Sequence, residues 1–239
     1  MLFRSETFAT RHRCYFLDFA QFGRSDMVPV HGPLLGWHAR KLLGFMDALG
    51  LERVHLINQS LGGAVALRLA ADSPQRVGRL ISIGAQPVDR GVLQPLPLFS
   101  KHAATLMSDY YLSDGGPSIS KMRVLLGRYE LHNDELLDDE NLRLRFEASD
   151  NASFIQLLQT PGAFGEWESL LPVLDRVQAP TLLCWGLHDW FGSVDVPMMM
   201  LNRLPDARLH VFGNAAHHLQ SECPDEFNRL ALSFIGAHE

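Results

Sequence analysis

The sequence predicts an α/β fold in which a mostly parallel sheet is covered by helices on both faces. Two observations carry this prediction. Short apolar runs alternate with segments of helical periodicity, and the alternation stops once, in the middle of the chain, before it resumes. We expect strands at 14–18, 54–57, 80–83, 181–185 and 209–212, and helices at 2–10, 34–49, 61–72, 196–204 and 225–235.

The interruption covers residues 91–165 and contains no strand-like runs. Its apolar residues recur at helical spacing in short segments, of which 125–129 and 142–146 are examples. We interpret this segment as a helical cap inserted into a core formed by residues 1–90 and 166–239. In such a core, catalytic residues gather where the parallel strands have their carboxyl ends.

Ser60 is the strongest candidate for chemistry, because it lies between an apolar strand and a helix that opens on glycines. A sharp strand-to-helix turn exposes a serine hydroxyl as a nucleophile and points the backbone N–H of Leu61 at an oxyanion. Gly62 and Gly63 leave room for neighbouring backbone. The usual motif has a glycine where this chain has Asn58, a residue that tolerates unusual backbone angles. The alternative interpretation is a serine that only caps a helix.

An acid and a histidine follow two later strands in the order serine, acid, histidine. Asp189 comes shortly after strand 181–185, and His217 comes shortly after strand 209–212. His217 would accept the proton of Ser60, and Asp189 would fix the imidazole tautomer. Taken singly, Asp189 could be a turn residue and His217 an ordinary histidine, and His218 is a rival base. The shared order and position favour a catalytic triad.

Composition excludes several other classes. The 239 residues are 46% hydrophobic, and the net charge of −6 comes without a basic run, which argues against nucleic acid and anionic membranes as partners. No apolar run is long enough to span a membrane. Three cysteines form no C-x-x-C pair that could hold zinc or carry out redox chemistry. We expect no metal and no cofactor. We expect a cytoplasmic protein that acts on a small molecule, and the sequence leaves homo-oligomerisation open.

Together these residues resemble the α/β-hydrolase fold and, within it, the meta-cleavage product hydrolases. Those enzymes cut a carbon–carbon bond in 2-hydroxy-6-oxo-dienoates from aromatic and steroid ring degradation. The resemblance rests on five segments along almost the whole chain: 18–26, 32–35, the turn at Ser60, 185–189 and 209–217. Residues 225–228 support the subfamily.

The resemblance also implies residues for substrate binding. A cap arginine of the family binds the substrate carboxylate, and Arg145 lies where this arginine is expected, with Arg143 as the second choice. A guanidinium group can bind a carboxylate through two hydrogen bonds. The alternative is a solvated arginine. Phe191 resembles a residue that packs on the non-polar end of the substrate, or it only packs in the core. Gln59 replaces an asparagine and His218 a tryptophan, both beside the expected substrate.

The N-terminus departs most from the family pattern, in which three strands precede the helix 2–10. The third of these strands ends in a His-Gly-Gly loop that donates an oxyanion N–H, and it lies between strands 14–18 and 54–57. Residues 31–33 imitate that loop but follow the wrong strand. Either the two flanking strands pair directly or the chain is part of a longer protein, and we favour the second. Gln21 replaces a common loop glycine.

The leading hypothesis is serine-dependent hydrolysis of a carbon–carbon bond in a dienoate, without a cofactor. A carboxylesterase or lactonase would use the same triad. A catalytically weak or non-catalytic ligand-binding relative is the third hypothesis, because loss of an oxyanion donor typically slows a hydrolase by about a hundred- to a thousandfold.

Overall fold

A parallel sheet forms the centre of the molecule. The computed structural model describes residues 6–85, 105–106, 108–113 and 115–236. In this part of the chain the sheet order is β1-β2-β3-β4, and every neighbouring pair is parallel. The strands are β1 (Val54–Gln59), β2 (Val77–Ile83), β3 (Thr181–Gly186) and β4 (Ala207–Phe212). The four predicted strands from 54 onward are therefore confirmed, as is the parallel fold class.

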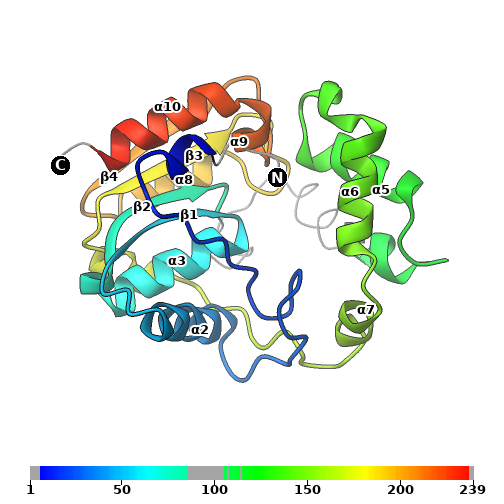
Figure 1. Cartoon of the computed structure of the whole chain (residues 1–239), viewed down its shortest axis with the longest axis horizontal. Helices are drawn as coiled ribbons and strands as arrows, with labels where there is room; N and C mark the ends of the chain where they lie inside the picture. Colours follow the sequence, from blue (N-terminus) through cyan, green and yellow to red (C-terminus); the bar gives the residue numbers. More distant parts are fainter. Residues whose placement is uncertain (1–5, 86–104, 107, 114, 237–239) are drawn as a thin grey trace.

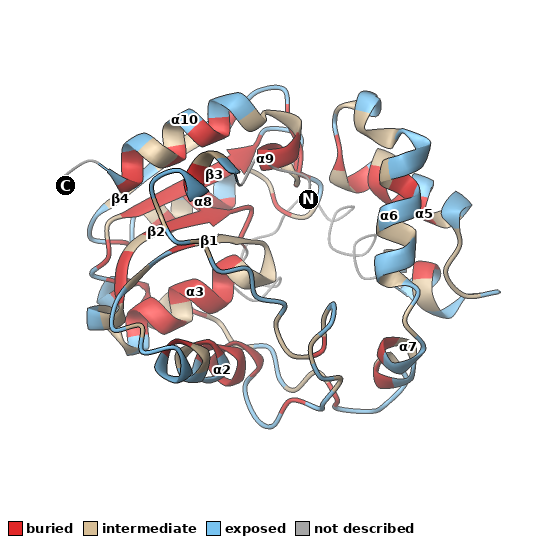
Figure 2. Cartoon of the chain, viewed as in Figure 1, coloured by how far each residue is buried: buried red, intermediate tan, exposed pale blue. Residues whose placement is uncertain are grey.

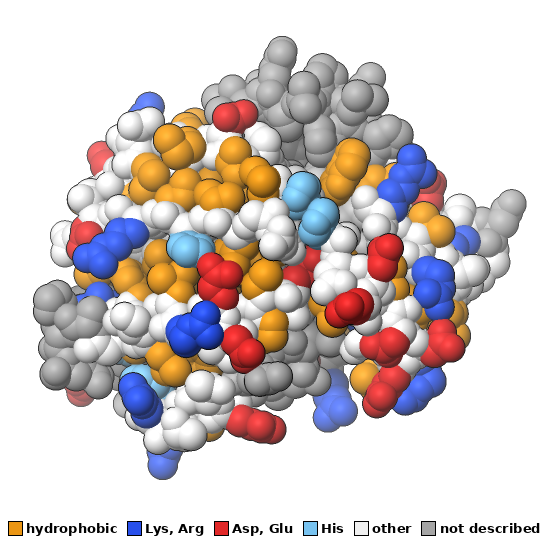
Figure 3. Space-filling view, turned by 90° about the horizontal axis from the view of Figure 1, so that it is seen from above, with side chains coloured by type: hydrophobic (Ala, Val, Ile, Leu, Met, Phe, Trp, Pro, Cys, Tyr) orange, Lys and Arg blue, Asp and Glu red, His pale blue; other side chains and the backbone are white. Residues whose placement is uncertain are grey.

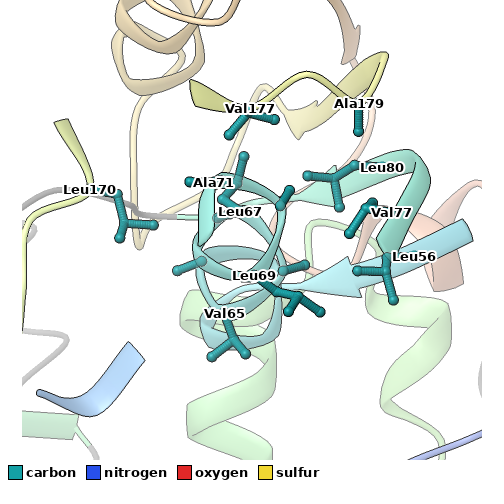
Figure 4. Close-up of a cluster of buried hydrophobic side chains, with 14 of the residues drawn as sticks. Leu56, Val65, Leu67, Leu69, Ala71, Val77, Leu80, Leu170, Val177 and Ala179 are labelled. Carbon is teal, nitrogen blue, oxygen red and sulfur yellow. The ribbon is translucent and has the colours of Figure 1, made fainter. Parts of the chain in front are cut away.

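One face of the sheet carries the larger apolar core. It is covered by α2 (Leu34–Ala48) and α3 (Leu61–Asp72), and α8 (Asp195–Leu201) packs into the same cluster. Figure 4 shows side chains of α3 between the strands and the segment that contains Leu170 and Val177. Small residues along α3 bring this helix close to the strands, so the segment after Ser60 is firmly held.

The opposite face is covered mainly by α10 (Pro224–Ile235), with α1 (Glu6–Ala9) beside it. Figure 1 shows the sheet between α10 on one side and α2 and α3 on the other. Successive strand residues alternate between the two cores, as the pleat requires: Leu183 faces the first, and Leu182 faces the second. The predicted helices at 34–49, 61–72, 196–204 and 225–235 are confirmed within a few residues.

A separate group of short helices lies beside the sheet domain (Figure 1). We call them the cap helices: α5 (Ile119–Leu125), η2 (Leu126–Glu130), η3 (Asp134–Leu137), α6 (Asp139–Ser149) and α7 (Ala152–Leu158). They form an apolar cluster of their own around Leu126 and Leu142. The predicted helical segment 142–146 lies within α6, whereas 125–129 crosses from α5 into a π-helical turn. The predicted domain boundary at residue 90 lies outside the described residues.

Three further short helical elements lie in the connections. They are η1 (Pro74–Arg76), η4 (Leu171–Arg176) and α9 (Leu219–Glu222). Figure 2 shows buried residues concentrated in β2, β3 and α3, whereas much of the surface of the cap helices is exposed. On the face in Figure 3, acidic and basic side chains are interspersed. Across the described residues, the helices are too short or too polar to cross a membrane.

The predicted strand at 14–18 is wrong. This segment forms no ladder with β1 in the described part of the chain, so the less favoured alternative, in which the two flanking strands pair directly, is not what the structure shows. Tyr15, Phe16 and Leu17 are 42%, 58% and 38% exposed, because no neighbouring strand covers them. Apolar alternation predicts a strand only where a partner satisfies its backbone groups. Gln21, in the expected glycine position, has a φ of 75° and is fully buried.

Candidate active site

The strand-to-helix turn holds Ser60 in a strained conformation. Its φ of 53° and ψ of −122° lie outside the regions that non-glycine residues favour, at a cost of roughly 1–3 kcal/mol. The Ser60 N–H donates to the carbonyl of Ile83 at 2.8 Å, which fixes the turn to β2. Leu61 then begins α3, where first-turn N–H groups have no helical partner. Asn58 lies inside β1 and takes no positive φ, so it needs no unusual backbone angle.

Glycines next to the turn allow the chain to pack closely. A Cβ on Gly63 would lie 2.6 Å from the Cβ of Ala85, so only glycine fits there. A Cβ on Gly62 would meet its nearest neighbour at 3.4 Å, which is close to ordinary contact. Gly63 is therefore needed for close packing, but its nearest neighbours are the side chains of Ala85 and Ser82 rather than the backbone that was predicted, and Gly62 is less crowded.

Asp189 and His217 meet at the carboxyl ends of β3 and β4. The His217 Nδ1 lies 2.8 Å from the Asp189 Oδ2, and their side chains are 7% and 1% exposed. The other carboxylate oxygen of Asp189 accepts the N–H of Phe191 at 2.8 Å. A carboxylate can only accept, so the His217 Nδ1 carries a proton and its Nε2 is left to act as a base. The Phe191 ring packs on His217, with 4.6 Å between ring centroids.

Two observations place this pair near the turn at Ser60. The Gln59 side chain, next to Ser60 in the chain, donates through Nε2 to the carbonyl of His217 at 2.6 Å. Gly84 follows Ile83, the residue that holds the Ser60 N–H, and a Cβ on Gly84 would lie 3.1 Å from both Asp189 Oδ2 and His217 Nδ1. The three predicted triad residues therefore gather at one edge of the sheet.

The electrostatic environment suits His217 to accept a proton. Burial alone would lower the pKa of His217, but the charge and hydrogen bond of Asp189 outweigh it. The net result is a pKa above the ordinary value of 6.5. Glu130 adds to this effect from the cap helices. An imidazole with a raised pKa is a stronger base, which is the property that activation of a serine requires.

The structure also separates the two candidate cap arginines. Arg143 is 53% exposed and pairs with Glu147 on the same helix at 2.8 Å. Arg145 is 22% exposed, and its Nη1 lies 3.4 Å from the His218 Nε2, one residue beyond His217. Of the two, Arg145 is the arginine that faces the site. Its assignment as a carboxylate ligand stays a prediction.

Glu130 and Gln220 were not predicted from the sequence, and the structure places both in the site. The Glu130 Oε2 lies 2.6 Å from the His218 Nε2, and Gln220 Nε2 donates to Gln59 Oε1 at 2.8 Å. Glu130 stands between Tyr129 and Leu131 and two residues after Arg128, so no local pattern singled it out. In the described part of the chain, histidine, cysteine and acidic side chains form no group of three that could hold a metal ion.

Comparisons with known proteins agree with this geometry. The family model described as alpha/beta hydrolase fold matches residues 3–224. A 2-hydroxy-6-oxononadienedioate/2-hydroxy-6-oxononatrienedioate hydrolase of a Pseudomonas species is 34% identical over 94% of this chain and 77% of its own. A 2-hydroxy-6-oxo-6-phenylhexa-2,4-dienoate hydrolase of Comamonas testosteroni is 32% identical with the same coverage. The structure of a meta-cleavage product hydrolase from Pseudomonas fluorescens IP01 superposes with a TM-score of 0.80, at 26% identity over 98% of this chain and 83% of that one.

Proposed function

Because the chain belongs to the alpha/beta hydrolase fold family and, within it, to the 2-hydroxy-6-oxo-dienoate hydrolases, we propose that it cleaves a carbon–carbon bond in such a dienoate through Ser60. One observation carries the proposal: the buried hydrogen bond between Asp189 and His217 lies beside the strained turn that presents Ser60. The substrate is a small molecule, and the reaction needs no cofactor.

The residues support the following order of steps. The dienol substrate first takes its keto form. His217 then removes the Ser60 proton, and the hydroxyl oxygen attacks the C6 ketone, whose oxyanion receives a hydrogen bond from the Leu61 N–H. The C5–C6 bond breaks, and its electron pair leaves as a dienolate that takes the proton from His217. Water activated by His217 finally hydrolyses the Ser60 ester and releases the carboxylic acid.

The rest of the site supplies substrate binding in this proposal. Arg145 binds the dienoate carboxylate, and Gln59 and His218 line the same polar end. Phe191, which packs on His217, contacts the non-polar end. The proposal includes residues 91–165 as a cap on a core of 1–90 and 166–239. A cytoplasmic location and a role in aromatic catabolism belong to it as well.

Paired arginine variants test the substrate assignment. Arg145→Gln should raise the KM for 2-hydroxy-6-oxo-6-phenylhexa-2,4-dienoate by about tenfold or more, because a carboxylate loses its cationic partner. The KM for p-nitrophenyl acetate, which has no carboxylate, should change little. Arg143→Gln, on the exposed side of the same helix, is the matched control and should leave both values unchanged.

The outcomes also separate the alternative functions. Hydrolysis of the ester without cleavage of the dienoate would favour a carboxylesterase or lactonase. Failure of a fluorophosphonate probe to react with Ser60 would favour a non-catalytic binding protein. Equal effects of Arg145→Gln on both substrates would remove Arg145 from carboxylate binding.

A further inference from the structure

The polar end of the site already contains a carboxylate of the protein itself. The Glu130 Oε2 lies 2.6 Å from the His218 Nε2 and 3.6 Å from the Arg145 Nη1. The side chains of Glu130, His218 and Arg145 are 15%, 14% and 22% exposed, so water screens this group weakly. The positive charge of Arg145 is therefore paired before any ligand arrives.

A chain of hydrogen bonds fixes the protonation of this cluster. Gln220 Nε2 donates to Gln59 Oε1, and Gln59 Nε2 donates to the carbonyl of His217, so the amide orientation of Gln59 is determined. The His218 Nδ1 lies 3.0 Å from the same Gln59 Nε2 and must accept. The His218 proton is then on Nε2, where it is donated to Glu130. The cluster thus holds a neutral imidazole and an ionised carboxylate.

The electrostatics agree with these states. Burial lowers the pKa of His218 below its ordinary value, and the charges of Arg145 and His217 add to the effect. Burial opposes ionisation of Glu130, but the hydrogen bond from His218 and the nearby positive charge hold its pKa below the ordinary value. The net charge of Glu130, His218 and Arg145 together is therefore zero at neutral pH.

The backbone holds Glu130 in this place. Its carbonyl accepts the N–H of His218 at 3.3 Å. Two residues further along the cap helices, the N–H groups of His132 and Asn133 donate to the Glu222 Oε2 at 2.6 and 2.9 Å. Glu222 Oε1 in turn accepts a backbone N–H at 2.7 Å in the loop that leads to His217. The segment that carries Glu130 is thus attached to the loop of the catalytic histidine.

We propose that Glu130 is a specificity-determining residue that occupies the Arg145 carboxylate site in the free protein and weakens the binding of ligand carboxylates. This inference rests on the proposed function, which assigns the ligand carboxylate to Arg145. A ligand carboxylate at Arg145 adds a second negative charge beside Glu130 in a poorly hydrated site, where like charges repel strongly. A neutral ligand of the same shape meets no such repulsion.

The test compares the binding of sorbate, a simple dienoate, with that of its neutral amide, sorbamide, by isothermal titration calorimetry. Glu130→Gln keeps an oxygen that accepts the His218 proton but removes the charge, so it should bind sorbate about tenfold more tightly than the wild type. Its affinity for sorbamide should change by less than about twofold. Glu140→Gln, which removes an exposed carboxylate on the helix of Arg145, is the matched control and should change neither affinity.

The wild-type protein provides a second measurement that needs no variant to fold. It should bind sorbate and sorbamide within about threefold of each other, and sorbate bound more than about tenfold more tightly would overturn the inference. The inference would also be overturned if Glu130→Gln had the melting temperature of the wild type and bound sorbate no more tightly. Because binding needs no turnover, an absence of dienoate cleavage would refute the proposed function without altering these results.

Discussion

Gly84 gives the most direct structural prediction, because its missing side chain makes room for the acid and base of the triad. Its φ is +54°, and an added Cβ would lie 3.1 Å from Asp189 Oδ2, 3.1 Å from His217 Nδ1 and 3.2 Å from His217 Cε1. These contacts are a few tenths of an ångström too short, and both partners are buried. Gly84→Ala should therefore push the imidazole away from Ser60 and lengthen its 2.8 Å hydrogen bond to Asp189.

The substitution has two effects of different size. Alanine in a left-handed conformation destabilises a protein by about 1–2 kcal/mol, and displacement of a catalytic group by up to an ångström slows reaction by up to about a hundredfold. Gly162→Ala is the matched control, because Gly162 has a φ of +74° and an added Cβ would meet nothing within 4 Å. It should share the loss of stability and keep the activity.

The assay is the rate at which a fluorophosphonate probe labels Ser60, followed at a temperature where both variants remain folded. We expect Gly84→Ala to react about ten- to a hundredfold more slowly than Gly162→Ala, with similar free energies of unfolding in urea. Labelling rates within twofold of each other would refute the proposed packing of Gly84 against the triad.

Two further predictions concern pH. Because protonated His217 cannot accept the Ser60 proton, kcat/KM for an ester should fall as pH drops through the raised pKa of His217, above 6.5. Asp189→Asn should move this fall to lower pH, because burial then lowers the pKa of His217 without the opposing charge of Asp189. An unchanged pH profile would contradict the assignment of His217 as the base. Burial lowers the pKa of His38 to about 4. As pH falls below about 6.5, the unfolded chain binds a proton at His38 while the folded chain does not. The free energy of unfolding should therefore fall by about 3 kcal/mol between about pH 6.5 and about pH 4. Urea unfolding at about pH 7 and about pH 5 should show a smaller loss of unfolding free energy for His38→Leu than for the wild type. Equal losses in the two proteins would argue against a lowered pKa of His38.

The central strands β2 and β3 could be predicted most directly because they are buried on both faces. Residues 182–185 form an apolar run, and this strand is followed by the helical periodicity of 196–204. The segment 14–18 has the same local pattern, yet it forms no ladder with β1, because strand formation depends on a neighbour that the local sequence does not specify. The cap was predicted as helical, but the π-helical turn at 126–130 could not be read from periodicity.

The triad could be predicted from order and position, since parallel strands bring their carboxyl ends to one edge. Asp189 and His217 do lie together there. Glu130 could not be predicted in the site, because it comes from the cap helices, and the packing of cap against core depends on contacts between residues about 90 apart in the chain. Gly84 was missed for a related reason, because its importance depends on the side chains opposite it.

The central claim is that Ser60 is the nucleophile of a carbon–carbon bond hydrolase. The most direct test is a single-turnover reaction of 2-hydroxy-6-oxo-6-phenylhexa-2,4-dienoate with the wild type and with Ser60→Ala, with benzoate measured as the product. We predict that the wild type releases benzoate and that Ser60→Ala, although folded and able to bind the dienoate, releases none above the uncatalysed rate. Benzoate release by Ser60→Ala at a rate close to that of the wild type would contradict the claim.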